Sequence, residues 1–151
     1  MRLFYFIIAL SISLISCGDE ELSQEVIDSN NDIEITNYLT ANNLTATKTA
    51  SGMYVRVVEE GSAEKPTIND EVTVNYSGYL IDDSIFDSST SPIKFPLSGV
   101  IRGWQEGIPY FGRGGSGSLY IPSRLAYGNS SPSSSIPANS VLIFDIELID
   151  F

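Results

Sequence analysis

The chain has 151 residues, of which 42% are hydrophobic and 18% charged, a composition typical of one globular domain with short extensions. It contains no histidine and one cysteine, which excludes histidine acid–base chemistry, an internal disulfide and a cysteine metal cage. A formal net charge of −11 disfavours binding to phosphate backbones, and there is no basic cluster. We therefore expect no metal, no cofactor and no nucleic-acid partner.

Residues 1–16 have the pattern of a secretory signal. Arg2 precedes an apolar run over residues 3–15, which is shorter than the ~20 residues that a membrane-spanning helix needs. The run ends in "LISC", residues 14–17, which resembles the lipobox of bacterial lipoproteins. The resemblance implies cleavage after Ser16 and lipid attachment to Cys17. It predicts an exported protein anchored to a bacterial envelope membrane, with the outer membrane, on its periplasmic or surface face, as the expected location. The alternative is an ordinary signal peptide with a chance cysteine.

Residues 17–50 are expected to form a lipid-anchored acidic tether that contains one short helix. Residues 18–31 are polar and acidic without sustained periodicity, which is typical of a flexible linker. Asn31 followed by Glu34 indicates a capping box, and Ile35, Tyr38 and Leu39 then follow at helical spacing. The pattern predicts a helix over residues 32–43, packed on the edge of the domain and without chemistry of its own.

A domain is expected over residues 51–151, where the pattern changes to alternation. Residues 53–58, 71–80, 118–122 and 141–151 are the predicted strands, separated by clusters of Gly, Pro, Ser and Asp. In the last of them Leu142, Phe144, Ile146 and Leu148 fall on one face. Strands and helices do not alternate, so the sheet should be antiparallel. With one short helix at residues 103–107 on one face, the predicted fold class is α+β.

Residues 112–117, "GRGGSG", match the G-x-G-x-x-G pattern of phosphate-binding loops. That chemistry needs a strand before the glycines and a helix after them, whose N-terminus faces the phosphate. Here a proline-containing turn precedes the run and an alternating strand follows it. We interpret the run as a glycine-rich turn that leads into a strand.

The stretch "VIRGWQEG", residues 100–107, contains the only tryptophan of the chain. Trp104 lies between Gly103 and Gly107 in the predicted short helix. A tryptophan that only fills a core rarely lies in so constrained a backbone, whereas one that forms the floor of a pocket could. This stretch is therefore the first candidate for a functional site.

Four stretches in this order resemble the FKBP family of peptidyl-prolyl cis–trans isomerases. They are "VTVNYSGYL…FDSS", "VIRGWQEGI", "LYIPSRLAYG" and "IPANSVLIFDIEL". The resemblance covers residues 51–151. It implies an antiparallel sheet bent around one short α-helix, an apolar pocket with Trp104 as its floor, and isomerase activity on X–Pro bonds.

The resemblance also implies the residues of the site. The catalytic residues would be Tyr76, Phe86, Asp87, Trp104, Tyr127 and Phe144, and the substrate-binding residues Val100, Ile101, Ile136 and Ile93. The backbone N–H of Ile101 and the hydroxyl of Tyr127 would bind substrate carbonyls, and Asp87 would accept a hydrogen bond from Tyr76. Taken singly, most of these residues also fit the role of a core residue, and Asp87 that of a turn residue.

Two functions remain open at this point. The first is an isomerase that assists the folding of exported or envelope proteins, because uncatalysed X–Pro isomerisation takes ~10–100 s. The second is a non-catalytic proline-recognising docking or chaperone module in an envelope complex, such as a gliding or secretion apparatus. The expected partners are proline-containing polypeptides, macrolides such as tacrolimus and rapamycin, and the membrane through the lipid on Cys17.

Overall fold

The computed structural model describes residues 22–151, and the predicted signal segment, the lipobox and Cys17 lie outside this range. No helix within it is both long enough and apolar enough to cross a membrane. Seven antiparallel strands form one sheet in the order β1-β2-β6-β7-β3-β4, and β5 also pairs with β3. The strands are β1 Thr47–Lys48, β2 Tyr54–Glu59, β3 Glu71–Tyr79, β4 Ile85–Ser88, β5 Ile93–Pro96, β6 Gly115–Ile121 and β7 Leu142–Asp150.

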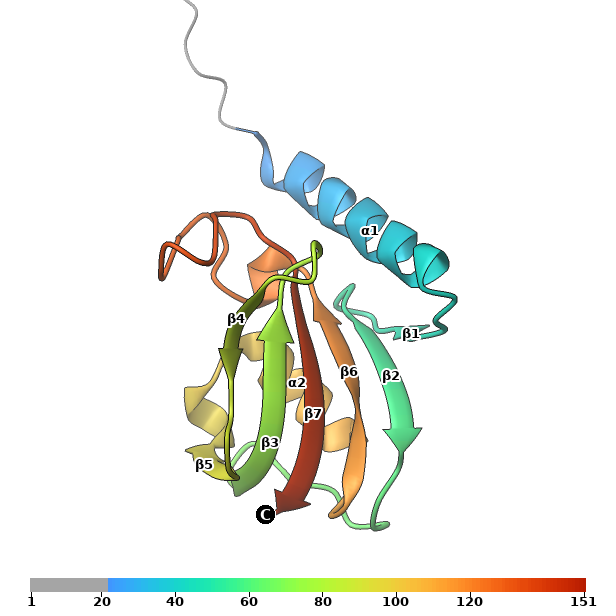
Figure 1. Cartoon of the computed structure of the whole chain (residues 1–151), viewed down its shortest axis with the longest axis vertical. Coiled ribbons are helices and arrows are strands. Elements are labelled where there is room, and N and C mark those ends of the chain that lie inside the picture. The colour runs from blue at the N-terminus through green and yellow to red at the C-terminus, as the bar shows by residue number, and fades with distance from the viewer. Residues whose placement is uncertain (1–21) are drawn as a thin grey trace, which may run out of the picture.

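The helices lie on opposite faces of this sheet (Figure 1). The short α2 lies against one face, and the long α1 crosses the end of the other. Single 3₁₀ turns follow β5, α2 and β6. The helices are α1 Gln24–Ala41 and α2 Arg102–Gly107, and the 3₁₀ turns are η1 Leu97–Gly99, η2 Ile108–Tyr110 and η3 Ser123–Leu125. This arrangement confirms the predicted antiparallel α+β class.

The C-terminal strand β7 lies in the middle of the sheet, between β6 and β3. Its predicted alternation is confirmed: Leu142, Phe144, Ile146 and Leu148 are buried on the face that α2 covers, and the two acidic residues between them are exposed. Three strands were not predicted: β1, β4 and β5. β1 is two residues long, and β4 and β5 are four residues long and combine apolar residues with Ser, Asp, Lys and Pro, so none of them shows a clear alternation.

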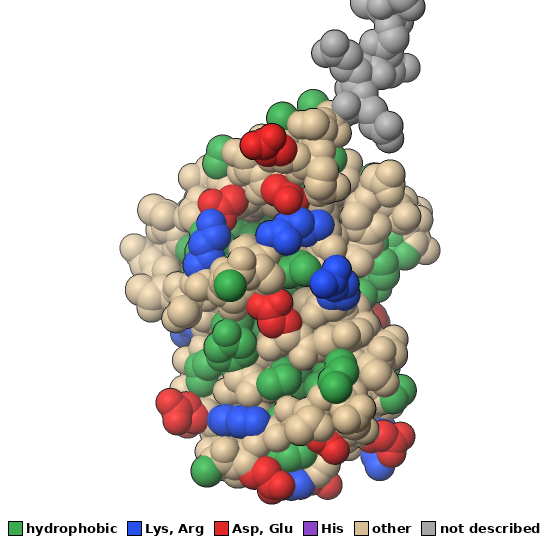
Figure 2. Space-filling view, turned by 180° about the vertical axis from the view of Figure 1, so that it is seen from behind, with side chains coloured by type: hydrophobic (Ala, Val, Ile, Leu, Met, Phe, Trp, Pro, Cys, Tyr) green, Lys and Arg blue, Asp and Glu red, His purple; other side chains and the backbone are tan. Residues whose placement is uncertain are grey.

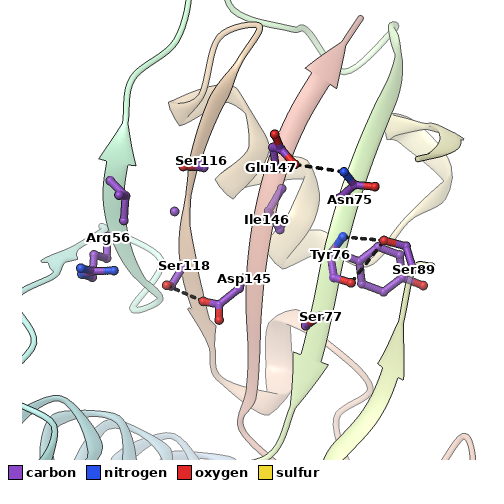
Figure 3. A pocket seen from close by; sticks show the side chains of 12 residues that line it. Arg56, Asn75, Tyr76, Ser77, Ser89, Ser116, Ser118, Asp145, Ile146 and Glu147 are labelled. Carbon is purple, nitrogen blue, oxygen red and sulfur yellow. Dashed lines mark hydrogen bonds between the residues drawn. The ribbon is translucent and has the colours of Figure 1, made fainter. Parts of the chain in front are cut away.

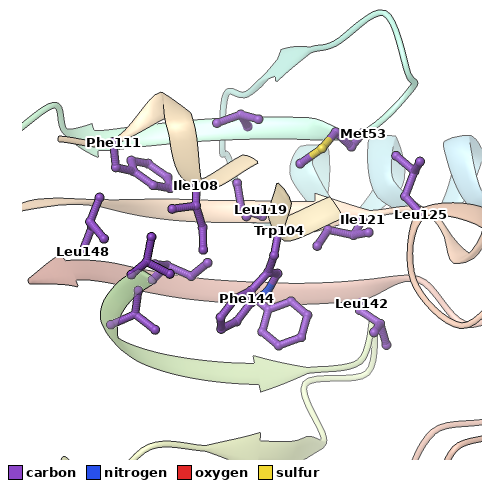
Figure 4. Packing of buried hydrophobic residues seen from close by; sticks show 14 of the residues in the cluster. Met53, Trp104, Ile108, Phe111, Leu119, Ile121, Leu125, Leu142, Phe144 and Leu148 are labelled. Carbon is purple, nitrogen blue, oxygen red and sulfur yellow. The ribbon is translucent and has the colours of Figure 1, made fainter. Parts of the chain in front are cut away.

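The core between the sheet and α2 explains the two glycines that flank Trp104. A methyl group on Gly103 would lie 2.5 Å from the side chain of Ile121, and one on Gly107 would lie 2.5 Å from that of Leu119. Because the two glycines are four residues apart, they lie on the same side of α2. The helix backbone therefore rests directly on β6, which places the indole of Trp104 deep in the core beside Phe144 (Figure 4).

Helix α1 begins eight residues earlier than the sequence predicted. Its N-cap is Ser23, whose side chain accepts a hydrogen bond from the backbone N–H of Val26, and the helix runs through Ala41. The predicted flexible tether is therefore wrong from residue 24 onward. Asn31, taken as the N-cap, lies inside the helix and is buried. The sheet also begins before the predicted boundary at residue 51, because β1 pairs with β2.

Helix α1 packs on the outer face of the sheet rather than on its edge. Ile35 and Leu39 of α1 form a second hydrophobic cluster with Tyr54, Tyr120 and Ile143, which come from β2, β6 and β7. These strand residues alternate with those that face α2, so here the sheet is buried on both faces. Polar contacts join α1 to the same region of the sheet: Asp32 of α1 accepts a hydrogen bond from the hydroxyl of Tyr54 at 2.9 Å and an ionic one from Lys48 at 2.6 Å.

Candidate functional site

Trp104 forms the floor of a pocket of about 470 Å³ on the side of the sheet that faces α2. Its side chain is only 4% exposed. The rings of Tyr76, Phe144 and Phe95 meet the indole edge-on, with centroids 5.2, 5.2 and 5.7 Å away. This edge-to-face geometry is favourable for aromatic rings and holds the indole in one orientation. The indole N–H is buried and has no acceptor among the described residues, so the floor offers a substrate almost nothing but aromatic surface.

The rest of the lining comes from six segments of the chain. They are β3, β4, β5, the stretch from η1 into α2, and the loop between β6 and β7, together with β7 itself. The lining residues are Tyr76, Phe86, Asp87, Phe95, Gly99, Val100, Ile101, Trp104, Tyr127, Pro132, Ser133, Ile136 and Phe144. Nine of the ten predicted site residues thus line one cavity.

The sequence assigned one wall residue wrongly. Ile93 does not line the pocket and is 38% exposed, whereas Phe95 lines it and contacts both Trp104 and Tyr76. Both residues lie on β5, where Val72 is the partner of Phe95 and Val74 that of Ile93. A two-residue error keeps a side chain on the same strand face but moves it about 7 Å along the strand, which is enough to leave the cavity.

The strand β4 brings Phe86 and Asp87 to the rim of the pocket. Phe86 packs edge-on against Phe144 at 5.5 Å. Gly78 lies beneath this pair, and a methyl group there would lie 2.7 Å from the ring of Phe86 and 2.8 Å from that of Phe144. Gly78 was not among the predicted site residues. The glycine in the middle of an otherwise alternating strand was the available signal, because it often marks a close approach of neighbouring groups.

Asp87 is joined to the pocket by the hydroxyl of Tyr76, which donates to its Oδ2 at 2.7 Å, as the resemblance implied. Burial, together with this hydrogen bond, raises the pKa of Tyr76 to about 12. Tyr76 is therefore a neutral donor at any physiological pH. The pair fixes a polar edge on a pocket whose other lining groups are mostly apolar.

The loop of residues 123–139, called the flap below, forms the outer wall. Tyr127 is 39% exposed and Ile136 is buried, and both face the cavity. The hydroxyl of Ser131 donates to the carbonyl of Ile136 at 2.7 Å, which holds the far side of the loop closed on itself. Pro132 and Ser133 add to the lining from the same loop, a contribution that its biased composition did not reveal.

The segment before α2 presents a backbone donor. Ile101 is the N-cap of α2, and its own N–H makes no backbone hydrogen bond within residues 22–151. The side-chain amide of Gln105 donates from its Nε2 to the carbonyl of Val100 at 2.8 Å and so fixes the peptide group between Val100 and Ile101. The N–H of Ile101 is therefore available at the cavity edge, in the position expected of a donor to a substrate carbonyl.

A second hollow lies on the outer face of the sheet and differs in chemistry (Figure 3). It has a volume of about 420 Å³, and small residues of β6 form its base. Two pairs of its polar side chains bind each other: Ser118 donates to Asp145 at 2.6 Å, and Asn75 donates to Glu147 at 3.0 Å. Its lining is mostly small and polar, so it lacks the enclosed apolar surface of a small-ligand site. We assign the site to the Trp104 pocket.

The charged side chains form no continuous basic patch on the face seen from behind (Figure 2). Lys and Arg side chains there alternate with Asp, Glu and apolar groups. Several basic groups are paired, as Arg124 is with Asp28 at 3.0 Å and Arg113 with Asp150 at 2.6 Å. Among residues 22–151 no three metal-ligating side chains come together.

A sheet wrapped around one short helix, with an indole at the floor of an aromatic pocket, defines a prolyl-isomerase-like domain. The family profile of the FKBP-type peptidyl-prolyl cis-trans isomerases matches residues 62–149, more than half of the chain. The chain belongs to this family. Its curated relatives include the probable FKBP-type isomerase FkpA of Neisseria meningitidis, 44% identical over 104 residues, and FkpA of Escherichia coli, 48% identical over 107.

The aligned part covers 67% and 68% of this chain but only 38% and 39% of those two relatives. The peptidyl-prolyl cis-trans isomerase Mip of Coxiella burnetii is 44% identical over 117 residues, which are 74% of this chain and 51% of Mip. The chain thus spans about 38–51% of the length of these relatives.

Solved structures show the same fold. The crystal structure of FkpA from Escherichia coli superposes with a TM-score of 0.71 at 39% identity, over 83% of this chain and 61% of that one. A peptidyl-prolyl cis-trans isomerase from Pseudomonas syringae superposes with a TM-score of 0.73 at 31% identity, over 85% of this chain and 96% of that one.

Proposed function

We propose that this chain is a peptidyl-prolyl cis–trans isomerase that accelerates the rotation of X–Pro bonds during the folding of exported or envelope proteins. The observation that carries the proposal is the pocket itself. Its floor is the indole of Trp104, its walls are edge-on aromatic rings, and its rim holds the Tyr76–Asp87 pair. Membership of the isomerase family supports the same reaction.

The reaction needs neither a nucleophile nor an acid–base pair. An X–Pro bond rotates over a barrier of about 18–20 kcal/mol because rotation breaks the amide conjugation. The planar amide is more polar than the twisted one, so an apolar, water-excluding pocket stabilises the twisted form relative to the planar form. In this mechanism Trp104 and Phe144 hold the proline ring, and the Ile101 N–H and the Tyr127 hydroxyl bind the neighbouring carbonyls.

The direct test is a protease-coupled assay on X–Pro peptides. We expect the purified domain to accelerate the slow cis-to-trans phase above the uncatalysed rate in proportion to its concentration. A parallel titration with rapamycin should change the fluorescence of Trp104, the only indole of the chain. Fluorescence that responds to rapamycin without any acceleration would instead favour a proline-recognising docking module. No response in either measurement would refute the assignment of the pocket.

The mechanism predicts an isomerase activity that is flat between about pH 6 and pH 9, because no histidine is present and Tyr76 remains neutral there. Stability should fall at higher pH. Burial raises the pKa of Tyr76 and of Tyr38 from 10.0 to about 12. Between these values the folded chain keeps protons that the unfolded chain loses, so the free energy of unfolding declines as pH rises.

Urea unfolding at several pH values between about 8 and 12 measures this decline, and the exchange of X–Pro peptides followed by NMR gives the activity profile without a coupling protease. A bell-shaped activity profile centred near neutral pH would contradict the mechanism, because it would require an acid–base pair.

We further propose that the protein is exported and anchored to an envelope membrane by a lipid on Cys17. The proposal rests on the resemblance of residues 14–17 to a lipobox at the only cysteine of the chain. The position of α1 adds a geometric consequence. Residues 18–23 alone separate Cys17 from α1, and six residues span at most about 20 Å. An anchored domain would therefore remain close to the membrane surface rather than at the end of a long tether.

Replacing Cys17 with serine should move the protein from the membrane fraction to the soluble fraction of the cells. The physical reason is that acyl chains contribute about 0.8 kcal/mol per buried CH₂, and the thioether cannot form without the thiol. Labelling with a radioactive fatty acid should mark the wild-type chain and not the variant. A variant that stays in the membrane fraction would refute the lipid anchor.

A further inference from the structure

Helix α1 carries a polar residue where its buried stripe should be apolar. The buried positions of the helix are four residues apart, namely Ile27, Asn31, Ile35 and Leu39. Asn31 is only 2% exposed. Asparagine is unfavourable in a helix interior, and a buried amide is costly unless it is hydrogen-bonded. A specific partner must therefore justify this position.

The partners of Asn31 are the two ends of the flap. Its Oδ1 accepts a hydrogen bond from the backbone N–H of Ser123 at 2.8 Å, and its Nδ2 donates to the carbonyl of Asn139 at 3.1 Å. These two residues are 16 positions apart in the sequence and delimit the loop that contains Tyr127 and Ile136. One side chain thus joins the beginning of the flap to its end.

The neck of the flap is closed by two further hydrogen bonds. The N–H of Gly128 donates to the carbonyl of Ser123 at 2.8 Å, and the N–H of Asn139 donates to the carbonyl of Gly128 at 2.7 Å. Gly128 and Asn139 both have positive φ angles, of 59° and 62°. Glycine and asparagine adopt this left-handed conformation readily, so the neck forms a tight turn at these positions, and Asn31 contacts it directly at Asn139.

A second contact ties the same region to α1. Arg124, the residue after Ser123, pairs with Asp28 of α1 at 3.0 Å and also donates to the carbonyl of Ser51. In Figure 1 the segment after β6 lies beside the N-terminal half of α1. Helix α1 therefore contacts the flap at its base, while the residues of the flap that line the pocket lie beyond this base.

We propose that Asn31 is a positioning residue for the substrate pocket, and that α1 acts through it to hold the flap in its binding conformation. The inference rests on the proposed isomerase function of the Trp104 pocket. Without the two hydrogen bonds of Asn31, the neck opens and the flap samples conformations in which Tyr127 and Ile136 do not face the cavity. A substrate then binds only the fraction of molecules with a closed flap, which weakens apparent affinity without changing the chemistry.

The test compares Asn31→Ala with Leu39→Ala. Leu39 lies on the same buried stripe of α1, but its side chain packs in the second hydrophobic cluster, with Ile35 and the strand residues. Amide exchange measured by NMR reports the flap directly. In Asn31→Ala we expect the amides of Gly128 and Asn139 to exchange at least ~10-fold faster, with sheet amides changed no more than in Leu39→Ala. We expect KM for an X–Pro peptide to rise about 3–10-fold at nearly constant kcat, and Kd for rapamycin to rise with it.

Asn31→Asp gives a second, reversible readout. At neutral pH a carboxylate keeps the acceptor for Ser123 but has no donor for Asn139, whereas a protonated carboxyl has an O–H that restores it. The charged groups near this position are Asp28 and Glu34 of α1 and Arg124 of η3. Because the wild type carries the same three groups, comparison with the wild type at each pH removes their contribution. Relative to the wild type at the same pH, the protection of Asn139 should recover as the pH falls.

The outcomes separate the two proposals. If the wild type does not accelerate isomerisation, the function fails, but the exchange of the flap amides still tests the role of Asn31. If Asn31→Ala leaves the flap amides and KM as they are in the wild type, the positioning role is refuted. It is also refuted if Leu39→Ala loosens the flap and raises KM equally, because Asn31 would then contribute only general stability.

Discussion

Replacing Trp104 with alanine is expected to lower kcat/KM for X–Pro isomerisation by at least about tenfold, a loss of about 1.4 kcal/mol of transition-state stabilisation. The indole is the surface on which the proline ring would rest, and three aromatic rings meet it edge-on. Its removal leaves a cavity that can admit water to the amide. The same substitution should lower the free energy of unfolding by about 3–5 kcal/mol, because a large buried aromatic side chain is lost.

Two controls separate activity from stability. Trp104→Phe keeps an aromatic floor and should retain most of the activity. Ile108→Ala removes a fully buried side chain from the same core without touching the pocket, so it should lower stability by about 2–5 kcal/mol and leave kcat/KM of the folded fraction nearly unchanged. If Ile108→Ala costs as much activity as Trp104→Ala, the loss reports stability and the indole has no special role.

Replacing Gly117 with alanine should destabilise the domain by about 3 kcal/mol or more, a large part of the 5–15 kcal/mol that stabilises a typical domain. A methyl group there would lie 2.0 Å from the carbonyl oxygen of Arg56 and 2.8 Å from the ring of Phe111. Gly117 pairs with Val57 of β2, beside the irregularity at Val57 and Glu59, and with Ile146 of β7 on its other side. The strand can therefore not move away from Arg56 without disturbing strand pairing.

Gly114 of the same run is the matched control. It has a φ of +74°, and a methyl group there would meet nothing within 4 Å. Gly114→Ala should therefore cost only the strain of a left-handed conformation, about 1 kcal/mol. Urea unfolding of both variants measures the difference. Equal losses would show that conformation, and not space, explains these glycines.

The glycine run shows where sequence reasoning was sufficient. The strand that follows residues 112–117 argued against a phosphate loop, and the structure has a turn leading into β6. The structure supplies the reason for the composition. Gly112, Gly115 and Gly117 lie where a methyl group would meet the backbone of neighbouring segments at 2.0 to 2.7 Å. The sequence pattern argued against a phosphate loop, but it could not show this steric requirement for glycine.

For the pocket, too, the sequence predicted most of the lining residues, and the structure decided the rest. The resemblance of four ordered motifs to the isomerase family placed nine of the ten predicted residues around one cavity. It could not decide between Ile93 and Phe95. Both residues lie on one face of β5, and only the pairing of β5 with β3 determines which of them reaches Trp104.

The sequence by itself determined the antiparallel sheet and the short helix, because periodicity reports which face of an element is buried, and the resemblance of its motifs to a known family implied the aromatic pocket. Only the tertiary structure decided the extent and role of α1. In the sequence Asn31 is an ordinary helix cap, since its local preference is for a helix end. In the folded chain it lies mid-helix, because Ser123 and Asn139, about 100 residues away, supply hydrogen bonds that local preference cannot anticipate.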